Sequence, residues 1–273
     1  MQQYQEKFFK TSAGNKIQYF DNENKPAKPL LIFFSPGFQN GQFIVRFDPR
    51  NDLKEFHNIS ITYPSRDNSE VIEDNSVINL VVMLFELIQK IQKANPKKQI
   101  YLVGFSFGTM LITKMLQLHQ TELAEMQIIL VSPGEFIPTL RNYFLQIVLF
   151  PTRFYFSYIR FVRWIFCRVL GIFQKYQFPD ERLEALNQQL LAALRYKIDR
   201  TILISNKTLI IVADRDQAIK RKSLVKIKEV FPKHYIRSYS GKHLIKYPAD
   251  PNIAVVREMV RTEIRNMESG SWK

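Results

Sequence analysis

Residues 100–116 read IYLVGFSFGTMLITKML, and they place Ser106 between two glycines where one apolar pattern changes into another. Residues 100–103 are a short apolar run typical of a buried strand, whereas residues 109–116 have helical spacing. Gly104 and Gly108 lack side chains and so allow a strand and a helix to pack closely around a sharp turn. The stretch therefore predicts a strand, a strained turn that exposes the serine hydroxyl, and a helix that begins beside it.

This Gly-x-Ser-x-Gly pattern, in its strand–turn–helix context, resembles the nucleophile elbow of the α/β-hydrolase family. The resemblance implies an α/β fold: a mostly parallel, eight-stranded type of sheet, with helices on both faces and a helical lid inserted between two late strands. It also implies a serine nucleophile of the esterase- and lipase-like branch, at Ser106. Such a serine needs a histidine to take its proton and an acid to orient that histidine, and the family order along the chain is serine, acid, histidine.

The chain contains four histidines, namely His57, His119, His234 and His243. The first precedes the elbow, and the second lies at the far end of the helix that follows it. His234 and His243 flank residues 235–239, which alternate like a strand. Ligand chemistry in parallel sheets lies outside the carboxyl ends of the strands, so His243 shares an edge with Ser106 and His234 does not. Residues 240–244 also resemble the family's Gly-x-His loop, and we predict His243 as the base.

The acid is expected after residues 208–213, a continuous apolar run typical of a strand buried in a parallel sheet. The family usually places its acid three residues after the small residue that ends this strand, which is Ala213 here. The resemblance therefore implies Asp216. Two alternatives stay open at this point: Asp214, which could also simply cap a turn, and Glu135, because some members carry the acid after an earlier strand.

Acyl transfer also needs two backbone donors for the developing oxyanion. The amide of Phe107, directly after the nucleophile, is the first candidate. Residues 35–39 resemble the family's His-Gly-x loop and imply the amide of Phe38 as the second, although Pro36 stands where the family most often has histidine. Because the donor is a main-chain amide, the proline need not abolish it. The alternative interpretation is a simple Pro-Gly turn.

Apolar patterns elsewhere predict an edge hairpin, two further strands and three helices. We expect the hairpin at 8–10 and 16–20, strands at 30–34 and 58–63, a short helix near Leu53, and helices over 77–91 and 253–264. Strands that alternate with helices imply a mostly parallel sheet covered on both faces. At 273 residues, one core with an insertion fits the length. We predict a core of residues 1–133 and 208–273, and a lid of residues 134–207.

The predicted lid is basic and aromatic. Between Glu135 and Asp180 there is no acidic residue but there are six basic ones: Arg141, Arg153, Arg160, Arg163, Arg168 and Lys175. Its apolar side could pack over the sheet and roof the active site, or residues 141–175 could contact an anionic membrane. Charges interrupt every apolar run before it is long enough to span a bilayer. Both interpretations imply an apolar, acyl-bearing substrate.

The net charge of +14 favours attraction to polyanions of any kind. No nucleic-acid-binding motif accompanies this charge, so we do not expect nucleic acid to be the natural ligand. We expect no metal and no cofactor, because no ligand cluster or phosphate loop is evident. The single cysteine, Cys167, is expected to pack among lid aromatics. Residues 1–7 lack the apolar core of a secretory signal, which favours a cytoplasmic protein. Peripheral attachment to the inner surface of the membrane is compatible with this location.

The sequence thus predicts a hydrolase that cleaves a carboxylic ester through Ser106, Asp216 and His243. Similar family members also cleave thioesters, peptides and carbon–carbon bonds. The alternative is a non-catalytic protein of the same fold that binds a lipid or a membrane partner. Pro36 favours this alternative, as does the loop 64–69, where the family's glycines are missing.

Overall fold

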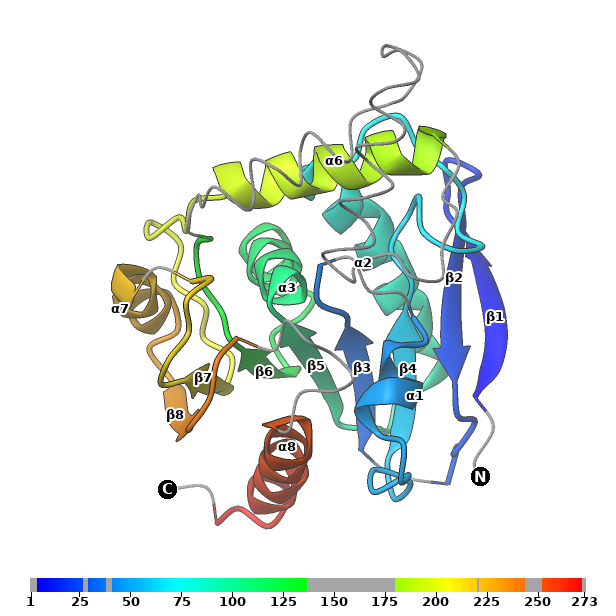
Figure 1. Ribbon diagram of the computed structural model, residues 1–273. Coiled ribbons are helices and arrows are strands. Elements are labelled where there is room, and N and C mark those ends of the chain that lie inside the picture. The colour runs from blue at the N-terminus through cyan, green and yellow to red at the C-terminus, as the bar shows by residue number, and fades with distance from the viewer. Residues whose placement is uncertain are drawn as a thin grey trace.

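The structure, a computed structural model, describes residues 4–26, 29–37, 41–136, 180–219, 221–243 and 252–271. Eight strands form one sheet in the order β1-β2-β4-β3-β5-β6-β7-β8 (Figure 1). The strands are β1 (Gln5–Lys10), β2 (Lys16–Asp21), β3 (Leu30–Phe34), β4 (His57–Ile61), β5 (Ile100–Phe105), β6 (Gln127–Val131), β7 (Thr208–Ala213) and β8 (His234–Tyr239). The hairpin β1–β2 pairs with β4 in the antiparallel sense, and all other neighbours are parallel. This confirms the predicted mostly parallel sheet.

Helices cover both faces of the sheet (Figure 1). They are α1 (Phe43–Phe47), α2 (Val77–Ala94), α3 (Phe107–Leu118), α6 (Asp180–Arg195), α7 (Arg221–Val230) and α8 (Asn252–Glu268). Alternate residues of a strand point to opposite faces. Along β3, Leu30 and Ile32 accordingly join the core under α2 and α3, whereas Leu31 and Phe33 join the core formed with α1 and α8. A strand buried on both faces must be apolar at every position, which explains the continuous apolar run of β3.

The first short helix lies upstream of the place predicted for it. Residues 52–55 form turns, and Leu53 is buried within them. The helical turn is instead α1, whose Phe43 and Phe47 rings stack with centroids 5.5 Å apart. Two aromatic residues four positions apart lie on one face of a helix, and here that face packs against the sheet.

The insertion between β6 and β7 is described at its two ends, 134–136 and 180–207. Its helix α6 crosses above α2 and α3 (Figure 1). The described residues do not include the basic and aromatic residues predicted for the lid, Cys167 among them, or Phe38 of the predicted oxyanion loop. The division into a core and a lid at 134–207 therefore stays a prediction.

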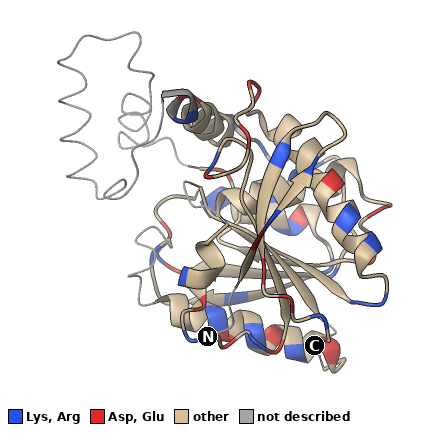
Figure 2. Ribbon diagram, turned by 90° about the vertical axis from the view of Figure 1, so that its right-hand side faces the viewer, with Lys and Arg blue, Asp and Glu red and all other residues tan. Residues whose placement is uncertain are grey.

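Basic and acidic residues are interspersed over the helices and strands seen in Figure 2. Among the helices of the described ranges, none combines the length and the apolar character needed to cross a membrane.

Candidate active site

Ser106 lies in the turn between β5 and α3, as predicted. Its backbone has φ 50° and ψ −109°, a conformation that costs a residue with a side chain on the order of 1–3 kcal/mol. Hydrogen bonds hold the turn in place: the Ser106 amide donates to the Val131 carbonyl at 2.9 Å, and the Thr109 amide donates to the Ser106 carbonyl at 3.0 Å. The turn thus places the serine side chain at the carboxyl edge of the parallel strands, where it is 8% exposed.

The two glycines of the motif are needed because of close packing. A Cβ atom on Gly104 would lie 2.8 Å from the Ile112 side chain and 3.0 Å from the Thr109 amide nitrogen. On Gly108, a Cβ atom would overlap the carbonyl oxygen of Phe34 and lie 2.8 Å from its Cβ. Any side chain at these positions would push α3 away from β5 and β3.

The structure brings His243 and Asp216 to the serine. His243 Nε2 lies 2.8 Å from Ser106 Oγ, and His243 Nδ1 lies 2.8 Å from Asp216 Oδ2. The other carboxylate oxygen of Asp216 accepts the amides of Ala218 and Ile219 at 2.9 and 3.1 Å. A neutral histidine whose Nδ1–H donates to Asp216 leaves Nε2 free to accept the serine proton. The arrangement can therefore move a proton away from the serine hydroxyl.

The environment of Asp216 favours its ionised form. Burial by itself would raise the pKa of this carboxyl group. The hydrogen bond to His243, the histidine's charge and the two backbone amides together lower the pKa by more than burial raises it, so the net pKa is lowered. The carboxylate is therefore ionised at neutral pH and can orient the imidazole.

The two alternative acids have other partners. Asp214 is exposed, and its carboxylate accepts the amide of Gly241 at 2.8 Å, which ties down the loop that carries His243. Glu135 is buried, and its carboxylate accepts hydrogen bonds from the Lys226 ammonium at 2.6 Å and from the Ile198 amide at 3.2 Å. Of the three candidate carboxylates, Asp216 is the one that the structure places on the histidine.

The other histidines lie away from Ser106. His234 begins β8 at the opposite edge of the sheet, where its Nδ1 lies 2.6 Å from the Phe231 carbonyl. His119 ends α3 and stacks on the ring of Phe85 at 3.5 Å.

The surroundings of the predicted oxyanion site are described in part. The amide of Phe107 belongs to the first turn of α3, where backbone donors have no partner within the helix. The loop after β3 lies beside it, since a Cβ atom on Gly37 would be 3.6 Å from the Phe107 Cβ. Next to the serine is a cavity of about 10 Å³, with room for about one water molecule. Its lining is mostly apolar: Pro36, Phe43, Phe105, Ser106, Val131, Ser132 and His243.

Sequence reasoning missed the contact between the glycine-free loop 64–69 and α6. The buried Arg66 guanidinium lies 4.8 Å from the Tyr63 ring and 6.0 Å from the Phe107 ring. Its Nε and one terminal nitrogen donate to the side-chain oxygen of Gln189, and the Gln189 amide donates to the carbonyl of Pro64 at 3.1 Å. Burial lowers the pKa of Arg66 to about 10, which still leaves it charged at neutral pH. Arg66 and Gln189 are 123 positions apart, and no local pattern pairs them.

In the part of the chain that the structure describes, no group of three or more His, Cys, Asp or Glu side chains is arranged to hold a metal ion.

No family model matches the sequence, and no curated protein matches it. Solved structures do match over nearly the whole chain. A 2-hydroxy-6-oxo-6-phenylhexa-2,4-dienoate hydrolase from Rhodococcus sp. strain RHA1 is 12% identical, with a TM-score of 0.67, and the match covers 96% of this chain and 99% of that one. A lipase-esterase related protein from Clostridium acetobutylicum ATCC 824 is 15% identical, with a TM-score of 0.67 and coverage of 90% and 98%.

An epoxide hydrolase from metagenomes of hot environments is 14% identical, with a TM-score of 0.58 and coverage of 94% and 97%. These structures are named for different reactions, so at this level of identity what they share with this chain is the arrangement of strands and helices. With the strand order and the serine turn described above, they establish that the chain has the α/β-hydrolase fold.

Proposed function

We propose that this protein is a serine hydrolase that cleaves a carboxylic ester of an apolar, acyl-bearing substrate. The observation that carries the proposal is the hydrogen-bonded series from Ser106 through His243 to Asp216, with both contacts at 2.8 Å. Nucleophile, base and orienting acid within hydrogen-bond reach of one another are what acyl transfer requires.

The proposed reaction has two halves. His243 takes the proton of Ser106 as the serine oxygen attacks the carbonyl carbon, and the amides of Phe107 and Phe38 hold the oxyanion. His243 then gives the proton to the departing alcohol, which leaves an acyl-enzyme. Water, deprotonated by the same histidine, attacks the acyl carbon, and the fatty or other carboxylic acid is released with the serine restored.

Two observations support an apolar substrate. The cavity beside the serine is lined mostly by apolar side chains, and the Phe136 ring contacts the His243 ring edge-on at 6.1 Å between centroids. The segment 137–179, rich in aromatic residues, belongs to the same insertion as Phe136. We propose that this insertion is the lid and that it provides the binding surface for the acyl group.

The test is the Ser106→Ala variant. We expect it to lose fluorophosphonate labelling and to lose p-nitrophenyl ester turnover by roughly 10³-fold or more, because the nucleophile is gone. The matched control is Ser238→Ala, at an exposed serine of β8, which should keep both signals. If Ser106→Ala is still labelled and still active, the proposal is wrong. If both signals are lost as expected, a panel of esters, thioesters and carbon–carbon substrates of graded chain length will define the substrate class.

A second candidate is a non-catalytic protein of this fold that binds a lipid or a membrane partner. It is favoured by the loop 64–69, in which the Arg66 side chain is buried where the family has glycines. In that case the unmodified protein would not react with fluorophosphonate but would bind lipid. We also propose, whichever of the two candidates holds, that residues 141–175 contact an anionic membrane. Flotation with anionic vesicles, but not with neutral ones, is the result expected for it.

A further inference from the structure

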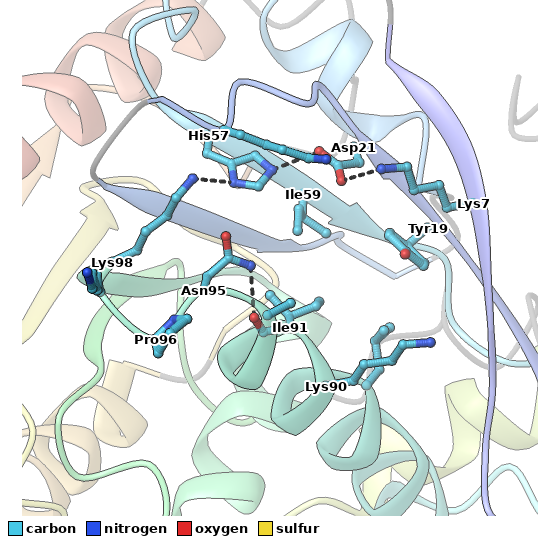
Figure 3. A pocket seen from close by; sticks show the side chains of 14 residues that line it. Lys7, Tyr19, Asp21, His57, Ile59, Lys90, Ile91, Asn95, Pro96 and Lys98 are labelled. Atoms are coloured by element: carbon cyan, nitrogen blue, oxygen red, sulfur yellow. Dashed lines mark hydrogen bonds and ion pairs between the residues drawn. The ribbon is translucent and has the colours of Figure 1, made fainter.

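A much larger cavity lies at the other edge of the sheet. Its volume is about 520 Å³, within the range of small-molecule sites, and it lies between β2, β4 and the C-terminal half of α2 (Figure 3). His57 begins β4 and Lys98 precedes β5, whereas Ser106 follows β5. The six residues of β5 therefore separate this cavity from the active-site serine by roughly 20 Å.

Cations dominate the polar lining of this cavity. Five of its residues are lysines: Lys7, Lys25, Lys90, Lys97 and Lys98. The single carboxylate among the lining residues, Asp21, already has two partners: Lys7 Nζ lies 2.8 Å from one of its oxygens, and His57 Nε2 donates to the other at 2.8 Å. Figure 3 shows His57 between Lys98 and Asp21, with Lys7 on the far side of Asp21.

Within the part of the chain that the structure describes, the remaining lysines lack acidic partners. Lys98 Nζ donates to His57 Nδ1 at 2.8 Å, which positions the ammonium group and leaves two of its three protons for a ligand. Among the described residues, Lys25, Lys90 and Lys97 form no ion pair with a carboxylate. Burial lowers the pKa of Lys98. The negative charge of Asp21 raises this pKa, whereas the positive charge of Lys25 lowers it, and the net pKa is lowered. An anion between Lys25 and Lys98 would relieve this repulsion.

The rest of the lining is largely apolar. Ile59, Leu87, Ile91 and Pro96 line the cavity, together with the ring of Tyr19. A bare inorganic anion would leave this surface unused, whereas a ligand with an apolar part would bury it. Several lysines around one site suit a phosphate, which carries more charge and more acceptor oxygens than a carboxylate.

We infer that this cavity binds a small molecule that carries a phosphate group and an apolar part. The phosphate lies among Lys25, Lys97 and Lys98, and the apolar part packs on Ile59 and Ile91. The source is either a soluble phosphorylated compound or the headgroup of a phospholipid. This site is separate from the proposed hydrolase site and does not depend on it.

The test is calorimetric titration of the full chain with octyl phosphate, inorganic phosphate and octanol. We expect octyl phosphate to bind more tightly than either of the others, and less tightly as salt is added. The double variant Lys25→Gln/Lys97→Gln should weaken its binding about tenfold or more, because it removes charge-assisted contacts without breaking a described ion pair. The matched control, Lys222→Gln/Lys228→Gln on the exposed side of α7, changes the net charge equally and should bind as the unmodified protein does.

Three further arms complete the test. Lys98→Gln should also weaken binding, with its thermal midpoint measured to separate loss of the site from loss of the fold. Ser106→Ala should bind octyl phosphate normally, which distinguishes this site from the active site. Vesicles that contain phosphatidic acid report a lipid source if they compete with octyl phosphate, and a soluble source if they do not. Absence of octyl phosphate binding, or equal loss in the cavity and control double variants, would overturn the inference.

Discussion

Ser106 has a positive φ although it is not a glycine, and the residues around it explain how the chain tolerates this. The energy cost of the turn is offset by the packing of α3 against β5 and β3, which brings Gly108 against the carbonyl of Phe34 at the end of β3. Strain of this kind persists where the surrounding structure over-determines the conformation, and it keeps the hydroxyl group turned toward His243.

Gly108→Ala should therefore be costly. Its new methyl group would overlap the Phe34 carbonyl oxygen, so α3 must shift, and we expect a loss of about 1–3 kcal/mol in unfolding free energy and weaker fluorophosphonate labelling. Urea unfolding and labelling of the same samples measure both effects. Gly270→Ala is the comparison: it has a φ of +69° but open space around it, so it should lose only stability, by about 1 kcal/mol.

Asp216→Asn tests the acid. At neutral pH we expect ester turnover to fall by roughly 10²–10⁴-fold, because the amide no longer holds the imidazole in the orientation and tautomer that accept the serine proton. The alternative acid gives the comparison: Asp214→Asn should lose far less turnover. If Asp214→Asn were the more damaging change, the assignment of Asp216 would be wrong.

The same variant has a predicted pH signature. The folded state lowers the pKa of Asp216, so its ionised form stabilises the protein above the unfolded pKa of about 4. This stabilisation is lost as the pH falls from there toward the folded-state pKa. The difference in unfolding free energy between the unmodified protein and Asp216→Asn should thus be present at pH 6–7 and shrink toward pH 3. A difference that grows with acid would contradict the direction of the shift.

A buried glutamine, Gln189, makes several of the hydrogen bonds that attach helix α6 to the core. Gln189 is 2% exposed, and its side-chain oxygen accepts hydrogen bonds from the Arg66 guanidinium. Its side-chain nitrogen donates to the carbonyl of Pro64 and, at 2.9 Å, to the side-chain oxygen of the buried Asn75. Because Arg66 also lies on the ring of Tyr63, this contact joins α6 to the loop after β4. The position of the predicted lid thus depends on a buried polar network and not on apolar packing alone.

Gln189→Leu should loosen α6. The change removes one hydrogen-bond partner from a buried charge and from two buried polar groups, and each lost partner costs about 1–3 kcal/mol. We expect a lower thermal midpoint and faster proteolysis within residues 180–207. Gln188→Leu is the control, since Gln188 is half-buried and, as far as the described ranges go, accepts hydrogen bonds from Asn75 alone, so its effect should be smaller. Equal effects of the two variants would mean that the Arg66 contact contributes little.

At the scale of the molecule as described, the sheet separates two apolar cores, and the two cavities discussed above lie at its opposite edges. Its central strands β3 and β5 are buried at every position, whereas β1 at one edge is mostly exposed. The small cavity beside Ser106 lies at the carboxyl edge of the parallel strands, and the lysine-lined cavity lies at the amino edge. Ligands could therefore occupy both without touching.

Hydrogen exchange should follow the order of strands in the sheet. Amides of β3, β5 and β6 have neighbours on both sides and buried faces, so we expect them to exchange slowest, near the rate set by global unfolding. Amides of β1, which has one neighbour, should exchange much faster. Mass spectrometry after deuterium labelling measures this, and equal protection of β1 and β5 would contradict the expected gradient.

The residues alone determined the sheet and the composition of the candidate site. Continuous apolar runs at 30–34, 100–105 and 208–213 belong to strands buried on both faces, and the glycines around Ser106 predict the turn. The order serine, acid, histidine, together with the resemblance, singled out Ser106 and His243, because the ends of parallel strands meet at one edge, and it favoured Asp216 while Asp214 and Glu135 stayed open. Their roles, and that of Phe38, stay predictions until the variants are measured.

Tertiary structure decided which of the candidate carboxylates meets the histidine, what fills the loop 64–69, and where a second cavity opens. Asp214 and Asp216 are two positions apart, so local sequence cannot choose between them, whereas the turn of the backbone directs one to His243 and the other to Gly241. Arg66 meets Gln189, and Lys25 nears Lys98, across long separations in the chain. Periodicity reports which side of an element is buried, but only the packed fold determines which distant side chains share that buried space.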